Sequence, residues 1–164
     1  AERVVLRGGS WGSYWASQLA HRYADRFVGV VAQGPAIHGA FAADWVQHVI
    51  DAGEYFFDWR IALAHAFGTD DTSQIETLMP PLSMQTQGVL DNPTPPMLLV
   101  NGLNDEVWPI DDTFLLLRHG TAKQAWVNPQ GIHMGRETGV WSSGRMNQEI
   151  INPWVVRQLG LTPP

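Results

Sequence analysis

A serine flanked by glycines stands near the start of the sequence, in the run GGSWG at residues 8–12. The pattern G-x-S-x-G is typical of a serine nucleophile held on a sharp turn between a strand and a helix. The run Val4–Arg7 before it predicts a buried strand, and Ser13–Tyr23 after it predicts a helix. This context favours Ser10 as a nucleophile, with glycines two residues before and after it leaving room for the strand and helix to approach. The backbone N–H of Trp11 is then a candidate oxyanion donor.

A serine nucleophile needs a histidine base and a carboxylate that orients the base. Asp105 follows a predicted strand at residues 97–101, in the kind of loop where parallel sheets carry functional groups. His133 follows a shorter predicted strand at residues 124–127, in a loop flanked by glycines. The chain order serine, acid, histidine is typical of enzymes with such a nucleophile turn. We therefore expect Ser10, Asp105 and His133 to form a catalytic triad.

Competing side chains occupy less suitable positions. Asp111 and Asp112 open the helix after Asp105 and are expected to stabilise the first turn of that helix. Asp91 precedes the strand that leads to Asp105 and is therefore expected at the opposite end of the sheet. Three histidines precede the acid and break the chain order: His38, His48 and His65. His21, on the helix after the nucleophile, is expected to face solvent, and His119 is expected to end a helix, where a cation is favourable.

Other chemistries find little support. The sequence has no cysteine, which excludes thiolate catalysis and cysteine zinc sites, and it has no H-x-x-x-H or H-E-x-x-H pair. It also lacks nucleotide-binding glycine loops, so no metal or cofactor is expected. With a net charge of −6 and no basic run, nucleic acid is not an expected partner. No apolar run approaches the roughly 20 residues that span a bilayer, so a membrane is not an expected partner either. The expected partner is a small-molecule substrate.

The elements around these residues predict an α/β fold with a mostly parallel sheet and helices on both faces. Residues 1–37 read as strand, helix and strand, with Phe27–Ala32 as the second strand, which is a βαβ unit. Residues 91–164 supply the third and fourth strands and a helix at 109–118 between them. A last helix is expected over Arg145–Leu159, with Pro153 kinking it or splitting it in two.

Residues 38–90 interrupt this alternation with an aromatic, helical insertion. Helices are predicted over Phe41–Gly53 and Glu54–Phe67, and loops over 69–73 and 79–83. Such an insertion is typical of a lid over an active site, although ordinary surface helices stay open as the alternative. Its aromatic residues favour a bulky or aromatic substrate: Trp45, Tyr55, Phe56, Phe57 and Trp59. We name Trp45, Phe56 and Met134 as candidate substrate-binding residues.

The segments 8–12, 101–105 and 131–135 together resemble the α/β-hydrolase superfamily. The run VVLRGGSWGSYWASQLA, followed by VVAQGPAIH, is similar to the branch with the fermentation-respiration switch esterase, fungal pigment polyketide-shortening hydrolases and 2,6-dihydropseudooxynicotine hydrolase. The spacings agree, with 95 residues from Ser10 to Asp105 and 28 from Asp105 to His133. The resemblance implies the C-terminal part of that fold, a helical cap, and a second oxyanion donor on a loop upstream of Ser10. We expect that upstream portion to be missing from this chain.

Three functions follow as hypotheses. The first is a serine hydrolase of ester-like carbonyl substrates, and the second is a carbon–carbon bond hydrolase of β-diketone or polyketide-like substrates with the same triad. A non-catalytic binding module with this fold is the alternative from another class, against which an intact triad argues. Acyl transfer in place of hydrolysis and assembly into a homo-oligomer stay open, and we expect a cytoplasmic location.

Overall fold

A computed structural model describes residues 3–53 and 57–162 of the chain. Four strands form one sheet in the order β1-β2-β3-β4, and each neighbouring pair is parallel. Their bounds are β1 Val5–Gly9, β2 Gly29–Gln33, β3 Met97–Gly102 and β4 Gln124–Asn128. The two central strands are buried along their whole length. The predicted α/β class with a parallel sheet is confirmed, and each strand lies within two residues of its predicted bounds.

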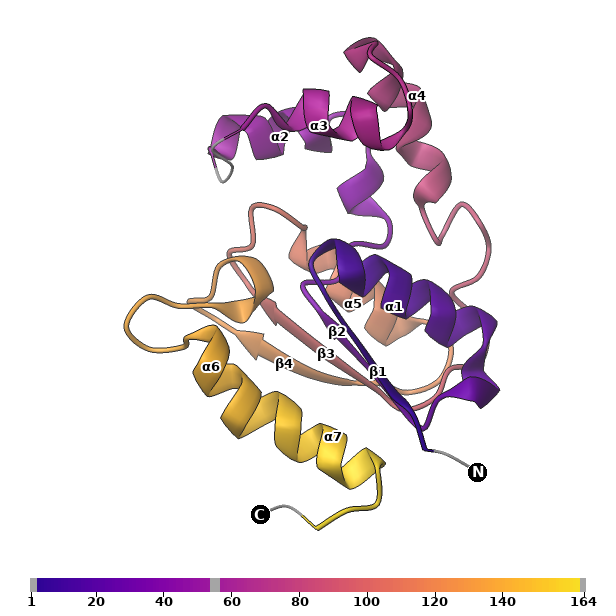
Figure 1. Ribbon diagram of the computed structural model, residues 1–164, viewed down its shortest axis with the longest axis vertical. Helices are drawn as coiled ribbons and strands as arrows, with labels where there is room; N and C mark the ends of the chain where they lie inside the picture. Colours follow the sequence, from indigo (N-terminus) through magenta and orange to yellow (C-terminus); the bar gives the residue numbers. More distant parts are fainter. Residues whose placement is uncertain (1–2, 54–56, 163–164) are drawn as a thin grey trace.

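Helices cover both faces of the sheet, as Figure 1 shows. On one face α1 (Trp11–Arg22) and α5 (Ile110–Arg118) pack against alternate strand residues that include Val30 and Leu99. On the other face Val31 and Val100 contact the C-terminal helix through residues such as Trp154. Successive side chains of a strand point to opposite faces, which is why neighbouring residues of β2 belong to two separate apolar clusters.

The C-terminal helix passes through Pro153 without a break. It consists of α6 (Ser143–Met146), a π-helical segment (Asn147–Ile151) and α7 (Asn152–Gln158), which follow one another directly. Proline has no N–H to donate, and in an α-helix its ring would clash with the carbonyl four residues earlier. The wider π turn just before it accommodates the missing bond. Of the two expected effects of Pro153, a kink or a split, the split is therefore wrong.

The segment between β2 and β3 is helical in the part of it that the structure describes. It contains α2 (Trp45–Ala52), α3 (Trp59–Ala66) and α4 (Ile75–Leu78). Single 3₁₀ turns occur at Gly39–Phe41, Thr72–Gln74 and Pro80–Leu82, the last two where loops were predicted. The predicted helix from Glu54 begins at Trp59, where the Asp58 side chain accepts the Ile61 N–H, and residues 54–56 lie outside the described ranges.

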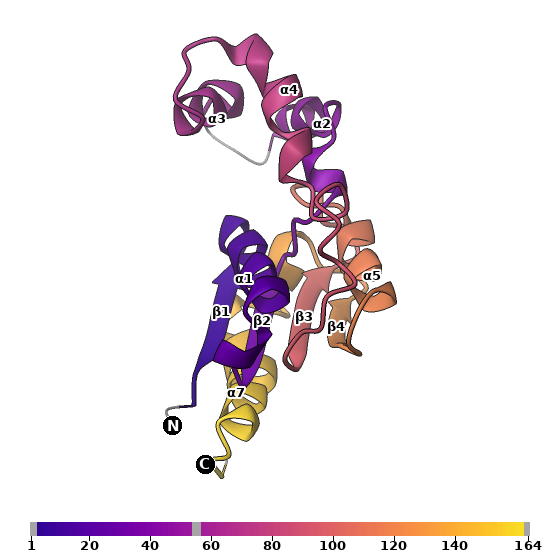
Figure 2. The ribbon, with the colours of Figure 1, turned by 90° about the vertical axis from the view of Figure 1, so that its right-hand side faces the viewer.

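This helical segment lies beyond the carboxyl ends of the strands, as Figures 1 and 2 show. Its buried residues, among them Val46, Leu63 and Met79, belong to the same apolar cluster as α1 and β3. The segment therefore packs onto the sheet domain through a shared core. None of the described helices is both long and apolar enough to cross a membrane.

Candidate active site

Ser10 lies on a strained turn between β1 and α1. Its backbone angles are φ 52° and ψ −127°, and a positive φ is uncommon for a residue with a side chain. The turn is held by hydrogen bonds from the Ser10 N–H to the Gln33 carbonyl at 2.8 Å and from the Ser13 N–H to the Ser10 carbonyl at 2.8 Å. Because the turn is sharp, β1 and the start of α1 approach each other closely.

The two glycines around Ser10 differ in how much space surrounds them. A Cβ added to Gly8 would lie 1.9 Å from the carbonyl oxygen of Gly12, so only glycine fits there. A Cβ added to Gly12 would meet no atom within 4 Å. The prediction that both glycines make room is therefore right for Gly8 and wrong for Gly12.

Asp105 follows β3 and its side chain is fully buried. Its Oδ1 accepts the backbone N–H groups of Val107 and Trp108, each at 2.9 Å. These two bonds fix the carboxylate inside its own loop, and the loop is tied to the histidine loop by a bond from the Asn104 N–H to the Gly131 carbonyl at 2.9 Å. The acid is thus oriented by main-chain donors on one side and faces the histidine on the other.

His133 joins the acid to the serine. Its Nδ1 lies 3.0 Å from Oδ2 and 3.1 Å from Oδ1 of Asp105, and its Nε2 lies 2.9 Å from the Oγ of Ser10. The carboxylate only accepts, so Nδ1 carries the proton and Nε2 is left to accept from the serine hydroxyl. The structure brings together all three residues that the sequence predicts as a triad, over separations of 28 and 123 residues.

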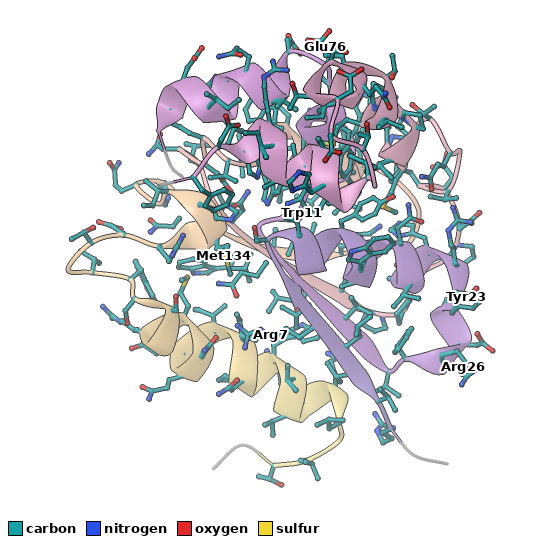
Figure 3. The ribbon with its side chains drawn as sticks, turned by 45° about the horizontal axis from the view of Figure 1, so that its top comes forward. Arg7, Trp11, Tyr23, Arg26, Glu76 and Met134 are labelled. Atoms are coloured by element: carbon teal, nitrogen blue, oxygen red, sulfur yellow. The ribbon has the colours of Figure 1, made fainter. Side chains whose placement is uncertain are left out.

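The loop that carries His133 is braced from β2. Met134 has a φ of 64°, and its carbonyl accepts the Nε2–H of the buried Gln33 at 3.1 Å. Arg7 of β1 in turn donates to the Gln33 side chain at 2.9 Å. Figure 3 shows Arg7 on the strand and Met134 on the loop beside it. Side chains from two neighbouring strands therefore hold the turn next to His133.

Trp11 is the first residue of α1 and directly follows Ser10, beneath the helical segment (Figure 3). The first N–H groups of a helix have no partner within it. No acceptor in residues 3–53 or 57–162 takes the Trp11 N–H. This N–H is available to a ligand oxygen next to Ser10, as an oxyanion donor must be.

Trp108 contributes a contact that the sequence did not indicate. Its indole Nε1–H donates to the Oγ of Ser10 at 3.1 Å, and its side chain is completely buried. The available signal is position, because Trp108 stands three residues after Asp105 in a loop at the carboxyl end of β3. Which atom an indole there would reach depends on the fold of the loop.

The candidate substrate-binding residues take different places. Trp45 donates its indole N–H to the Val107 carbonyl at 2.8 Å, which links the helical segment to the acid loop. The side chain of Met134 lies against the turn at Ser10, since a Cβ on Gly9 would come within 2.9 Å of its methyl carbon. Phe56, like Tyr55, lies outside the described residues. Trp59 is buried against Trp108, with ring centroids 5.8 Å apart, whereas Phe57 is 57% exposed.

Two side chains have roles different from those predicted. Asp112 is buried, and its carboxylate accepts four backbone N–H groups of the loop after β2, at 2.7–3.3 Å: those of Ile37, His38, Gly39 and Ala40. It therefore organises a distant loop instead of the first turn of α5. His21 is 3% exposed and does not face solvent, because its Nδ1 bonds the Ser17 carbonyl at 2.8 Å along the inner side of α1.

The remaining histidines make contacts away from Ser10. His38 bonds the Ser83 hydroxyl at 2.8 Å, His48 stacks on Trp45, and His119 pairs with Asp91 at 2.9 Å. His65 lies 3.3 Å from Asp70 on the surface. Within the described ranges, no three residues of the metal-binding types are grouped so that they could hold an ion.

No protein-family model matches the sequence, and no curated protein matches it. Solved structures do share its architecture. AbyA5 superposes on 98% of the chain with a TM-score of 0.75 at 17% identity, and a 2,6-dihydroxy-pseudo-oxynicotine hydrolase on 96% with a TM-score of 0.70 at 17% identity. A monoacylglycerol lipase of Paleococcus ferrophilus matches 96% of the chain with a TM-score of 0.62 at 16% identity.

The chain has the α/β-hydrolase fold. This confirms, at the level of the fold, the resemblance that the three sequence segments indicated. The chain spans 44% of the length of AbyA5, 41% of the length of the 2,6-dihydroxy-pseudo-oxynicotine hydrolase and 69% of the length of the lipase.

Proposed function

We propose that this chain carries the catalytic centre of a serine hydrolase, with Ser10 as nucleophile, His133 as general base and Asp105 as the orienting acid. The observation that supports this most directly is the unbroken series of hydrogen bonds from Ser10 Oγ through the imidazole to the buried carboxylate. The names of the structural neighbours, which include esterases and a lipase, agree with a hydrolase.

The chemistry follows from the roles of the atoms. His133 Nε2 takes the hydroxyl proton while Ser10 Oγ attacks the substrate carbonyl, and the Trp11 N–H binds the oxygen that becomes negative. The imidazolium, stabilised by Asp105, then protonates the leaving group, which departs and leaves an acyl-enzyme. Water, activated by the same histidine, releases the acid and restores the serine.

For the substrate we propose an ester-like carbonyl compound with a bulky or aromatic part. Aromatic rings surround the nucleophile turn, with Trp11 in edge contact with Trp108 at 5.1 Å and Phe41 5.9 Å from Trp11. An open hollow of about 710 Å³ lies between Gly53 of the helical segment and the histidine loop, where Ile132, Arg136 and Trp141 line it. A hollow of this volume has room for a bulky group, and Ile132, which lines it, directly precedes His133 in the chain.

Covalent labelling tests the nucleophile. We expect a fluorophosphonate probe to label the protein and Ser10→Ala to abolish the labelling, because only a serine paired with a base reacts readily with it. Ser143→Ala is the matched control, since Ser143 is exposed and lies outside the triad. Circular dichroism checks that each variant is folded. A folded wild type that takes up no label would refute the catalytic role of Ser10 and leave the binding module as the better reading.

The same triad serves both ester and carbon–carbon cleavage, so parallel assays decide between them. A p-nitrophenyl ester with an aromatic acyl group and a β-diketone are compared in the wild type and in Ser10→Ala. We expect serine-dependent turnover of the ester to exceed that of the diketone. The reverse order would transfer the assignment to carbon–carbon hydrolysis.

A further inference from the structure

The Oγ of Ser10 forms hydrogen bonds with two side chains. It lies 2.9 Å from His133 Nε2 and 3.1 Å from the indole nitrogen of Trp108. A hydroxyl has one proton, and the accepting imidazole nitrogen takes it. The bond from Trp108 must then run from the indole N–H to a lone pair of the serine oxygen.

The position of this indole is determined by its surroundings. Its own backbone N–H is bound to Asp105, and its ring contacts Trp11 at 5.1 Å and His133 at 6.3 Å between centroids. An indole has one donor and no acceptor, so Trp108 cannot take the serine proton in place of the histidine. What it can supply is a fixed positive partial charge at the reacting oxygen.

We propose that Trp108 is a further catalytic residue, whose indole N–H stabilises negative charge on the Oγ of Ser10. The proposal rests on the hydrolase function proposed above. In attack, the O–H bond breaks, its proton moves to His133 and the oxygen's electron pair forms the bond to the carbonyl carbon. In release of the acyl group, the bond between Oγ and carbon breaks, the electron pair returns to Oγ, and the imidazolium returns the proton.

The donor matters most when Oγ carries most charge. During attack the oxygen passes its charge to the substrate, so the gain from the N–H is partly lost. During collapse of the second tetrahedral intermediate Oγ is the leaving group and gains charge, so the N–H makes it easier to expel. Trp108 therefore assists deacylation more than acylation.

The decisive variant is Trp108→Phe, which removes the N–H and keeps an aromatic ring. Trp154→Phe is the matched control, because Trp154 is also buried and its indole also makes one hydrogen bond, to Gln124 at 2.7 Å, but on the other face of the sheet. With p-nitrophenyl acetate, the initial burst measures acylation and the steady rate measures deacylation. We expect Trp108→Phe to slow deacylation by about 10- to 100-fold, the effect of losing one hydrogen bond to a charged group, with a smaller loss in the burst.

The outcomes separate the two proposals. If the fluorophosphonate labels the wild type but Trp108→Phe and Trp154→Phe deacylate at the same rate, the role of Trp108 is refuted and the hydrolase stands. If the folded wild type takes up no label, both proposals fall. A burst slowed as much as the steady rate would also overturn the assignment to deacylation.

A second measurement does not depend on Trp108→Phe being folded. In the wild type and in Ser10→Ala, NMR follows the indole N–H resonance of Trp108, assigned through its contacts with His133. Loss of the hydroxyl acceptor is expected to move this resonance upfield and to speed its exchange with water. A resonance that stays unchanged would show that the hydrogen bond is not made and would overturn the proposal.

Discussion

At the scale of single residues, Asp112 connects two parts of the chain that the site depends on. Its carboxylate accepts N–H groups from residues 72–75 positions earlier, in the loop where the chain leaves β2 for the helical segment. Burial raises the pKa of the Asp112 carboxyl, and the four N–H groups oppose that shift. The side chain thus determines where the helical segment begins.

We expect Asp112→Ala to destabilise the protein by about 3 kcal/mol, because it leaves several buried N–H groups without their acceptor. Asp111→Ala, at the exposed neighbouring position, is expected to cost less than about 1 kcal/mol, the size of a helix-dipole effect. Urea unfolding of the two variants measures both values. Equal losses would contradict the proposed role of the buried carboxylate.

Residue types and chain order were enough to predict that Ser10, Asp105 and His133 come together, since each follows a predicted strand at its carboxyl end. The hydrogen bonds of the Trp108 and Asp112 side chains could not be predicted in this way. Their partners are 98 and up to 75 residues away, and only the packing of loops shows which backbone or hydroxyl group a side chain reaches. The assignment of His21 to the surface failed for a similar reason, because the helix face it occupies is covered by other elements.

At the scale of elements, the contact between β1 and α1 determines how the Ser10 side chain is presented. The backbone of Gly12 comes so near to Gly8 that no side chain fits on the strand, while the helix position itself is open. The strands were predictable because buried apolar runs end in glycine or polar residues. The π segment could not be predicted, because a proline such as Pro153 is equally compatible with a kink, a break or a wider turn of the helix.

Gly8→Ala is expected to abolish fluorophosphonate labelling and to lower the free energy of unfolding by more than 2 kcal/mol, since backbone must move to admit the methyl group. Gly12→Ala keeps the fold and gains up to about 1 kcal/mol from helix propensity, because Gly12 lies within α1. Thermal unfolding and labelling of the two variants side by side provide the comparison. A labelled, stable Gly8→Ala protein would contradict the close approach.

At the scale of the whole molecule, the free energy of unfolding depends on a buried histidine, His21. Burial lowers the pKa of His21 below its ordinary value of 6.5. In the unfolded chain this group binds a proton as the pH falls through 6.5, while in the folded protein it stays neutral to lower pH. The unfolded state then binds more protons, so stability is lost as the pH falls below 6.5.

We expect the free energy of unfolding to be smaller at pH 5.5 than at pH 7.5, and His21→Phe to reduce that difference. His65→Gln, at an exposed histidine, serves as the control and leaves the difference unchanged. Urea titrations at the two pH values test this. An unaltered pH dependence in folded His21→Phe would show that other groups cause it.

The order of the strands has a consequence for how quickly reactivity appears during refolding. The pairs β1–β2 and β3–β4 each join segments that are near in sequence. The pairing of β2 with β3 must instead close a loop that contains the long segment between Gln33 and Met97. Closing a long loop costs chain entropy before its contacts are gained, so this step is the slow one. The turn at Ser10, formed with the first pair, therefore meets Asp105 and His133 only when the two halves of this four-stranded sheet join.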